Sequence, residues 1–167
     1  MNRRRAILFF HPVLNGLCSP LLNDFDLAGS VGTTMEDTVV ALHMIVAQIP
    51  HRYPNIKIIV PHFGGLIPML LHRMDNQITA TYPDLPERPS VTVRRFWYDT
   101  VGHGSVAALR CACEAFGPEH LVTGSDYPVL LPYESYARTF SYIREAELPG
   151  NAAEQILYRS APALFGR

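Results

Sequence analysis

The sequence predicts an α/β fold: the second half of a TIM-type (β/α)8 barrel, with four parallel strand–helix units and a C-terminal helix. Short apolar runs alternate with segments of helical spacing, which is the order expected of a parallel sheet covered by helices. Three of these runs end in a histidine or an aspartate, at the edge where such barrels place their chemistry. A closed barrel needs roughly 200 to 250 residues. The four strand–helix units expected in these 167 residues are half of the eight that a closed barrel contains.

The expected units follow one another from residue 6 to residue 164. Thr34-Met-Glu-Asp37 resembles a capping box for the first long helix, and Asn151 is expected to cap the last. The proline-rich stretch from Tyr82 to Pro89 is expected to be an exposed loop, so residues 1–167 form a single, incomplete domain. The expected strands are Ala6 to Phe10, Ile56 to Pro61, Phe96 to Asp99 and Leu121 to Gly124. The expected helices are about Met35 to Gln48, Leu66 to Ile78, Val106 to Phe116, Tyr133 to Glu147 and Ala152 to Leu164.

Composition argues against several classes of partner. The chain is 48% hydrophobic with a formal charge of −1, so there is no electrostatic reason to expect nucleic acid or an anionic membrane. No apolar segment approaches the roughly 20 residues of a membrane span. The three cysteines match neither an even disulfide set nor a zinc-type pair. We therefore expect a cytoplasmic protein with reduced thiols.

Three side chains at strand ends are the candidates for catalysis and metal binding. His62 precedes Gly64-Gly65, where backbone can approach a ligand closely, and its imidazole can move a proton near neutral pH. His11 can give an imidazole nitrogen to a metal, while Asp126 can bind the metal or take a proton from metal-bound water. Each has a structural alternative: a backbone-bonded histidine at His11, a helix-capping turn at His62 and an Asx turn at Asp126. Their order, at the ends of the first, second and fourth strands, favours a shared site.

Two further residues are weaker candidates for substrate binding. Asp99 ends the third expected strand and could orient substrate or support a metal ligand, although Asp99 or Thr100 is favoured as the cap of the next helix. Arg73 lies on the helix after His62 and could hold a carboxylate through two parallel hydrogen bonds. A solvated helix arginine is the alternative for Arg73.

Several motifs together carry a family resemblance. They are Tyr53-Pro-Asn-Ile-Lys-Ile-Ile-Val-Pro-His-Phe-Gly-Gly65, Arg73-Met-Asp75, Phe96-Trp-Tyr-Asp-Thr100, Gly124-Ser-Asp-Tyr-Pro128 and the closing Ile156 to Gly166. They resemble the amidohydrolase-related (amidohydrolase 2) enzymes typified by aminocarboxymuconate semialdehyde decarboxylase and the resorcylate decarboxylases. The similarity runs from His11 nearly to the C-terminus, although an Asn-Ala pair more commonly stands where this chain has Ser160-Ala161.

This resemblance implies a distorted barrel with one divalent metal ion, usually zinc and sometimes manganese. His11 matches the family's metal-binding histidine of a His-Pro pair, Asp126 its metal-binding aspartate, and His62 its catalytic histidine. Arg73 matches an arginine that reaches the substrate carboxylate in decarboxylase members, in some cases across a dimer interface. The family's first-strand His-x-His pair, which gives two more ligands, does not occur in this sequence. Metal binding by these residues alone is therefore expected to be incomplete.

Two functional hypotheses follow. The first is the C-terminal half of a metal-dependent decarboxylase or hydrolase that acts on a small carboxylated substrate, with the activity of the isolated chain left open. The second is a non-catalytic, truncated half-barrel that associates through its open sheet edges, for example as a homo-oligomer. A nucleotide-binding module is disfavoured because no strand is followed by G-x-G-x-x-G or a P-loop.

Overall fold

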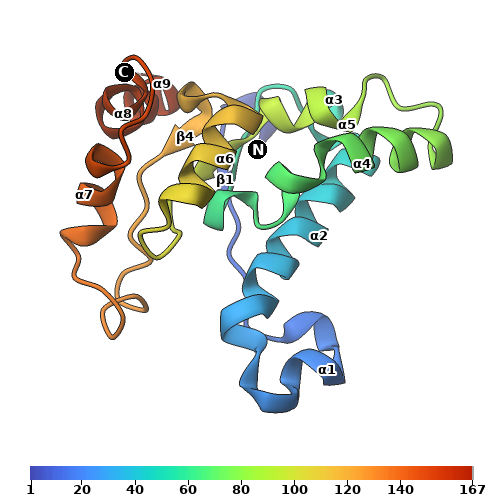
Figure 1. Cartoon of the computed structure of the whole chain (residues 1–167). Helices are drawn as coiled ribbons and strands as arrows, with labels where there is room; N and C mark the ends of the chain where they lie inside the picture. The colour runs from blue at the N-terminus through green and yellow to red at the C-terminus, as the bar shows by residue number, and fades with distance from the viewer. Residues whose placement is uncertain (167) are drawn as a thin grey trace.

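A four-stranded parallel sheet in the order β1-β2-β3-β4 forms the centre of the computed structural model, which describes residues 1–166 (Figure 1). In the register, Leu8 lies beside Ile58, and Tyr98 lies beside Leu121. Consecutive strands are neighbours that run in one direction, so each connection crosses over through helical segments. The strands are β1 (Ile7–Phe9), β2 (Lys57–Val60), β3 (Trp97–Asp99) and β4 (Leu121–Val122).

The helices between the strands agree in order with the sequence prediction. The bounds of α6 are those predicted, whereas α7 is shorter because residues Tyr133 to Ala137 form turns instead of its first part. Within residues 1–166, no helix is long and apolar enough to cross a membrane. The longer helices are α2 (Thr33–Val46), α4 (Ile67–Thr81), α6 (Val106–Phe116) and α7 (Arg138–Glu145). The shorter ones are α1 (Pro20–Asn23), α3 (Ile49–Arg52), α5 (Pro89–Thr92), α8 (Ala152–Glu154) and α9 (Ser160–Phe165), with a π-helical turn, Gln155–Arg159, between the last two.

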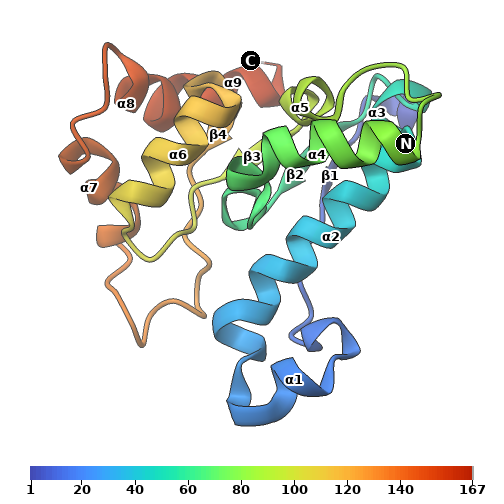
Figure 2. The same ribbon diagram turned by 45° about the vertical axis from the view of Figure 1, so that its right-hand side comes forward.

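The two faces of the sheet pack against different parts of the chain. Because side chains alternate along a strand, one face presents Ile58, Val60 and Tyr98 to the main core, which α2, α4, α6 and α7 complete. Figure 2 shows α4 and α6 side by side on this face. The other face presents Ile59 and Val122 to a smaller cluster around Leu164 of α9. This second face is only partly covered.

The predicted capping box at Thr34 is wrong. Helix α2 continues directly from a π-helical turn over Ala28–Gly32, and the Thr34 hydroxyl donates to the Val31 carbonyl. The acidic residues of the motif, Glu36 and Asp37, are buried and bond to other segments of the chain. Their side chains therefore make tertiary contacts and do not cap the helix.

The other expected caps also differ from the structure. Ser105 caps α6, because its hydroxyl oxygen accepts from the Ala108 N–H, so neither Asp99 nor Thr100 has this role. Asn151 stands at the start of α8, but its side chain makes no capping hydrogen bond. Asp99 is instead buried, and its carboxylate accepts from the backbone N–H groups of His62 and Val101.

Glu87, in the loop between α4 and α5, accepts several side-chain hydrogen bonds. Its carboxylate accepts two hydrogen bonds from the Arg95 guanidinium, at 2.7 and 2.9 Å, and one from the Thr92 hydroxyl at 2.9 Å. The hydrogen bond from Arg95 is the main reason that the pKa of the Glu87 carboxyl falls to about 2. Folding therefore favours the charged form of Glu87.

Glu87→Gln is expected to lower the free energy of unfolding at neutral pH by about 1 kcal/mol, since solvent around the half-exposed Arg95 screens the pair. The contribution of the charged carboxylate is fully present above its ordinary pKa of 4.5 and is lost as the pH falls towards about 2. The gap between the two proteins should therefore close over that range in urea unfolding. Glu154→Gln, at an exposed pair with Arg159, is the control and should show no such convergence. A gap that stays constant with pH would contradict the assignment.

Candidate metal and catalytic site

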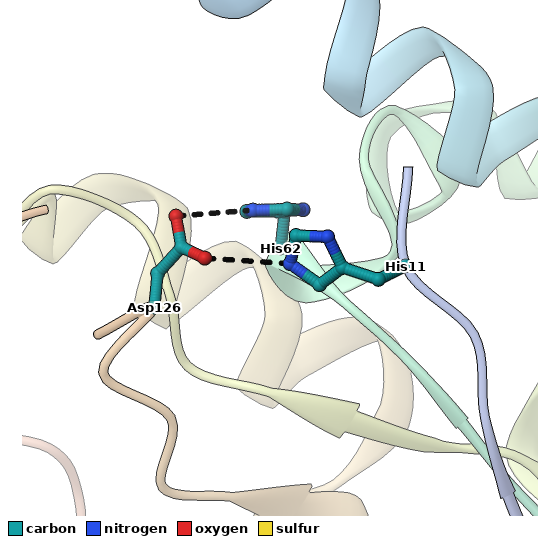
Figure 3. A group of neighbouring side chains, drawn as sticks. All are labelled: His11, His62 and Asp126. Atoms are coloured by element: carbon teal, nitrogen blue, oxygen red, sulfur yellow. Dashed lines mark ion pairs between the residues drawn. The ribbon is translucent and has the colours of Figure 1, made fainter. Parts of the chain in front are cut away.

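Segments that follow β1, β2 and β4 bring together His11, His62 and Asp126 (Figure 3). His11 Nε2 lies 3.3 Å from Asp126 Oδ1, and His62 Nε2 lies 4.0 Å from Asp126 Oδ2. The ligand-type atoms of the three residues all lie within 4.8 Å of one another. Figure 3 shows the two imidazole rings facing different oxygens of the one carboxylate. The three residues singled out in the sequence thus form one cluster.

His62 is held at the end of β2 by its backbone as well as its ring. Its φ of 51° lies in the left-handed region, which a residue with a side chain adopts only when its surroundings stabilise it. The backbone N–H of His62 donates to Asp99 Oδ1 at 2.8 Å, and the same oxygen accepts from the Val101 N–H at 3.1 Å. The Asp99 carboxylate therefore ties the turn after β2 to the loop after β3.

The glycines after His62 are required by close packing. An added Cβ on Gly64 would lie 2.7 Å from the Tyr98 ring, and one on Gly65 would lie 2.1 Å from the Thr34 carbonyl oxygen. Both glycines have positive φ, 74° and 61°. The turn that carries His62 is thus pressed against β3 on one side and α2 on the other.

Two residues of α2, expected from the sequence to lie at a helix start, bond to His62 and to the loop after His11. Asp37 Oδ2 lies 2.8 Å from His62 Nδ1, and the Asp37 side chain is fully buried. The neighbouring Glu36 accepts backbone N–H bonds from Val13 and Gly16, each at 2.9 Å, in the loop that follows His11. Two adjacent acidic residues inside a largely apolar helix were the sequence signal for this role.

Opposing effects set the protonation of the site. Burial alone would lower the pKa of His62, but the hydrogen bond to Asp37 and the negative fields of Asp99, Asp37 and Asp126 outweigh it, so the pKa lies above its ordinary value. Burial raises the pKa of the Asp99 carboxyl to about 6. Burial also raises the pKa of Asp37, against the opposing hydrogen bond from His62. These carboxylates favour the protonated form of His62.

The two residues predicted to bind substrate lie in different surroundings. Asp99 is buried and borders a cavity of about 420 Å³, which also reaches His11 and Asp126. Arg73 is exposed on α4 and makes no hydrogen bond or ion pair with the other described residues. Its side chain does not line this cavity. The structure therefore places Asp99 beside the cluster and leaves Arg73 outside it.

The chemistry of the cluster fits a divalent metal. Two ligand atoms that each lie about 2.1 Å from a tetrahedral ion are roughly 3.4 Å apart. The 3.3 Å between His11 Nε2 and Asp126 Oδ1 matches that separation. His62 lies farther from the carboxylate, at 4.0 Å, and its second nitrogen is bonded to Asp37, as is common for histidines at metal sites.

Comparisons with known proteins identify relatives of this chain. Residues 1–167 match the family model described as Amidohydrolase. The curated 6-methylsalicylic acid decarboxylase of Penicillium expansum is 28% identical over 170 residues, which cover 100% of this chain and 52% of that protein. The 2-amino-3-carboxymuconate-6-semialdehyde decarboxylase of Dictyostelium discoideum is 29% identical over 161 residues, covering 89% and 44% respectively. The solved structure of 5-carboxyvanillate decarboxylase LigW from Sphingomonas paucimobilis has a TM-score of 0.81 and 28% identity, covering 99% of this chain and 50% of that one.

These likenesses bear on both the fold and the family. The chain spans about half the length of the curated relatives it matches. Its four parallel strands and alternating helices form half of a TIM-type barrel, which confirms the predicted fold class. The resemblance carried by the motifs around His62 and Asp126 is confirmed as well. With its whole length matched by the family model, the chain belongs to the amidohydrolase family.

Proposed function

We propose that this chain carries the metal-binding and proton-transferring residues of a metal-dependent decarboxylase of small aromatic carboxylates. The convergence of His11, His62 and Asp126 within 4.8 Å is the observation that supports this most strongly. The curated relatives and the solved structure described above are decarboxylases, which favours carbon–carbon cleavage over hydrolysis. Zinc and manganese are the two metals to be tested.

In this proposal, His11 and Asp126 hold the metal and His62 moves the proton. A bound metal would supply a Lewis acid that draws electron density from acidic oxygens of the substrate. His62 directs Nδ1 to Asp37 and Nε2 towards Asp126, so its protonated ring presents a proton on the cluster side. When the bond between the ring carbon and the carboxylate breaks, carbon dioxide leaves and the carbon takes one proton. His62 is placed to donate it.

The cavity beside the cluster would receive the aromatic ring. Its walls include the apolar side chains of Phe9, Ile59 and Val122, while His11 and Asp126 stand at its polar side. An apolar pocket with a few polar groups on one side orients a ring and its carboxylate in a single direction. Arg73 and Asp99 remain proposed substrate-binding residues; of the two, Asp99 borders this cavity.

Metal content and carbon dioxide release test the proposal together. We expect the purified chain, supplied with zinc or manganese, to retain metal, and His11→Ala and Asp126→Ala to lose it. With 6-methylsalicylate and 5-carboxyvanillate as probes, His62→Gln should lower carbon dioxide release by on the order of 10² to 10⁴-fold while keeping the metal. His43→Ala, an exposed histidine of α2, is the matched control. The assay is run on the chain alone and with the complementary half of a relative co-expressed.

Three outcomes would count against the proposal. Metal retained by both ligand variants would remove His11 and Asp126 from the metal site. Unchanged carbon dioxide release in His62→Gln would remove its catalytic role. Hydrolysis of an aryl ester or lactone without carbon dioxide release would show that the reaction is hydrolysis and not decarboxylation.

A non-catalytic half-barrel is the second candidate. Phe9, on the incompletely covered face of the sheet, is 54% exposed. A parallel sheet is normally buried on both faces, so such a surface favours association. A chain that binds no metal and forms oligomers in sedimentation would support this candidate.

A further inference from the structure

Asp37 is an unusual residue for its position. It lies inside α2, where an apolar side chain would pack on the sheet, and its side chain is fully buried. Its Oδ2 meets His62 Nδ1 at 2.8 Å, across 25 residues of sequence. Its other oxygen, Oδ1, is buried and has no hydrogen-bond partner among residues 1–166. A half-satisfied buried carboxylate destabilises the fold.

Stability alone does not explain such a carboxylate. Replacing a buried ion pair by well-packed apolar residues is often neutral or stabilising. The Glu36 side chain offers a contrast, because each of its oxygens accepts a backbone N–H and it thereby orders a loop. The only hydrogen bond that the Asp37 side chain makes within residues 1–166 is to an imidazole, so the carboxylate acts on the protonation and orientation of that ring.

An ionised carboxylate accepts hydrogen bonds but donates none. The nitrogen of His62 that faces Asp37 must therefore carry the proton, which is Nδ1. In the neutral ring this leaves Nε2 without a proton, facing Asp126 and the His11 ring, whose centroid lies 5.4 Å away. Asp99 holds the backbone of the same residue at 2.8 Å. Backbone and ring of His62 are thus held independently.

We propose that Asp37 is the positioning residue of His62: it fixes the neutral ring in the Nδ1–H tautomer, so that Nε2, on the side of the cluster, is the nitrogen that gains and gives up the transferred proton. Its importance for catalysis rests on the proposed function, but the tautomer itself does not. The expected consequence for turnover is a loss of about 10 to 100-fold in kcat when the carboxylate is removed, as is typical for groups that orient a metal-site histidine. KM should stay unchanged, because the fully buried Asp37 side chain does not line the cavity proposed for the substrate.

The tautomer can be observed directly. The chain is labelled with ¹⁵N-histidine, freed of metal with a chelator and studied at alkaline pH, where His62 is neutral; His62→Gln identifies its signals. We expect the proton on Nδ1 in the wild type and a shift of population to the Nε2–H form in Asp37→Asn. Asp75→Asn is the matched control, since Asp75 is a carboxylate of α4 that accepts from the Ser90 N–H and hydroxyl. This control should leave the His62 signals in place.

The outcomes separate this proposal from the proposed function. An Nε2–H tautomer in the wild type overturns it even if Asp37→Asn fails to fold. An unchanged tautomer and unchanged kcat in Asp37→Asn also overturn it. If the wild type releases no carbon dioxide, the proposed function fails, while the tautomer still decides the role of Asp37.

Discussion

Replacing Gly65 with alanine is expected to lower the free energy of unfolding by about 3 to 5 kcal/mol, the sum of a strained backbone and an overpacked contact. Gly65 has a φ of 61° and a ψ of −116°, a region that residues with a side chain avoid. Its added methyl group would lie 2.1 Å from the Thr34 carbonyl oxygen and 2.5 Å from the Thr38 hydroxyl oxygen. That hydroxyl accepts the Leu66 N–H at 2.8 Å, so the methyl group would also disturb the connection to α4.

Gly150→Ala is the control for a glycine of positive φ that has no close contact. Gly150 has the same φ of 61°, but nothing lies within 4 Å of an added Cβ. Its alanine variant should therefore lose only about 1 kcal/mol, the usual effect of the backbone conformation. Urea unfolding of both variants gives the comparison. Equal losses would show that close packing against α2 does not hold the turn, and no loss at Gly65 would contradict the contact itself.

Tyr98→Ala is expected to lower the free energy of unfolding by about 4 to 6 kcal/mol, from the cavity it leaves and the hydrogen bond it loses. The Tyr98 ring is fully buried and stacks on Phe116, with centroids 3.7 Å apart and an interplanar angle of 5°. Its hydroxyl donates to the Val93 carbonyl at 2.8 Å. Because the ring also packs directly against Gly64, its removal would leave the turn that carries His62 without packing support on that side.

Tyr98→Phe is the control for this position. It keeps the ring and removes only the hydroxyl, so a loss of about 1 to 2 kcal/mol is expected from the buried Val93 carbonyl left without its partner. Thermal and urea unfolding measure both variants. If the phenylalanine variant lost as much stability as the alanine variant, the hydrogen bond rather than the packing of the ring would support the turn.

The architecture could be predicted from sequence because it depends on local periodicity. The runs before His11 and His62 are apolar, as a strand covered by helices requires, and the spacing from Val106 to Phe116 gave the bounds of α6 correctly. The expected start of α7 was wrong, because the helix begins at Arg138. A helix was expected from Tyr133, but in the structure Tyr133 to Ala137 form turns in the segment that follows Asp126.

The support of the site could not be predicted from sequence in the same way. Glu36 and Asp37 sit in a pattern that also describes a helix start, and only the folded chain brings them to residues 20 and 25 positions away. Asp99 was expected to cap a helix for the same reason, since a strand-end aspartate has a common local use. In the structure Asp99 accepts from the nearby Val101 N–H and also from the His62 N–H, which is 37 residues distant.

Glu36 and Asp37 are consecutive residues of α2, and they bond to the loop after His11 and to the ring of His62 respectively. A helix rotates by about 100° per residue, so inserting one residue ahead of Glu36 in α2 would turn both carboxylates away from their partners at once. The segment between His11 and α2 extends away from the sheet in Figure 1. Its length can vary only if α2 keeps the same rotation about its own axis, so that both carboxylates still face their partners. The loop after His11 and the ring of His62 are thus both bonded to α2, and a change in the rotation of this helix would break both sets of contacts together.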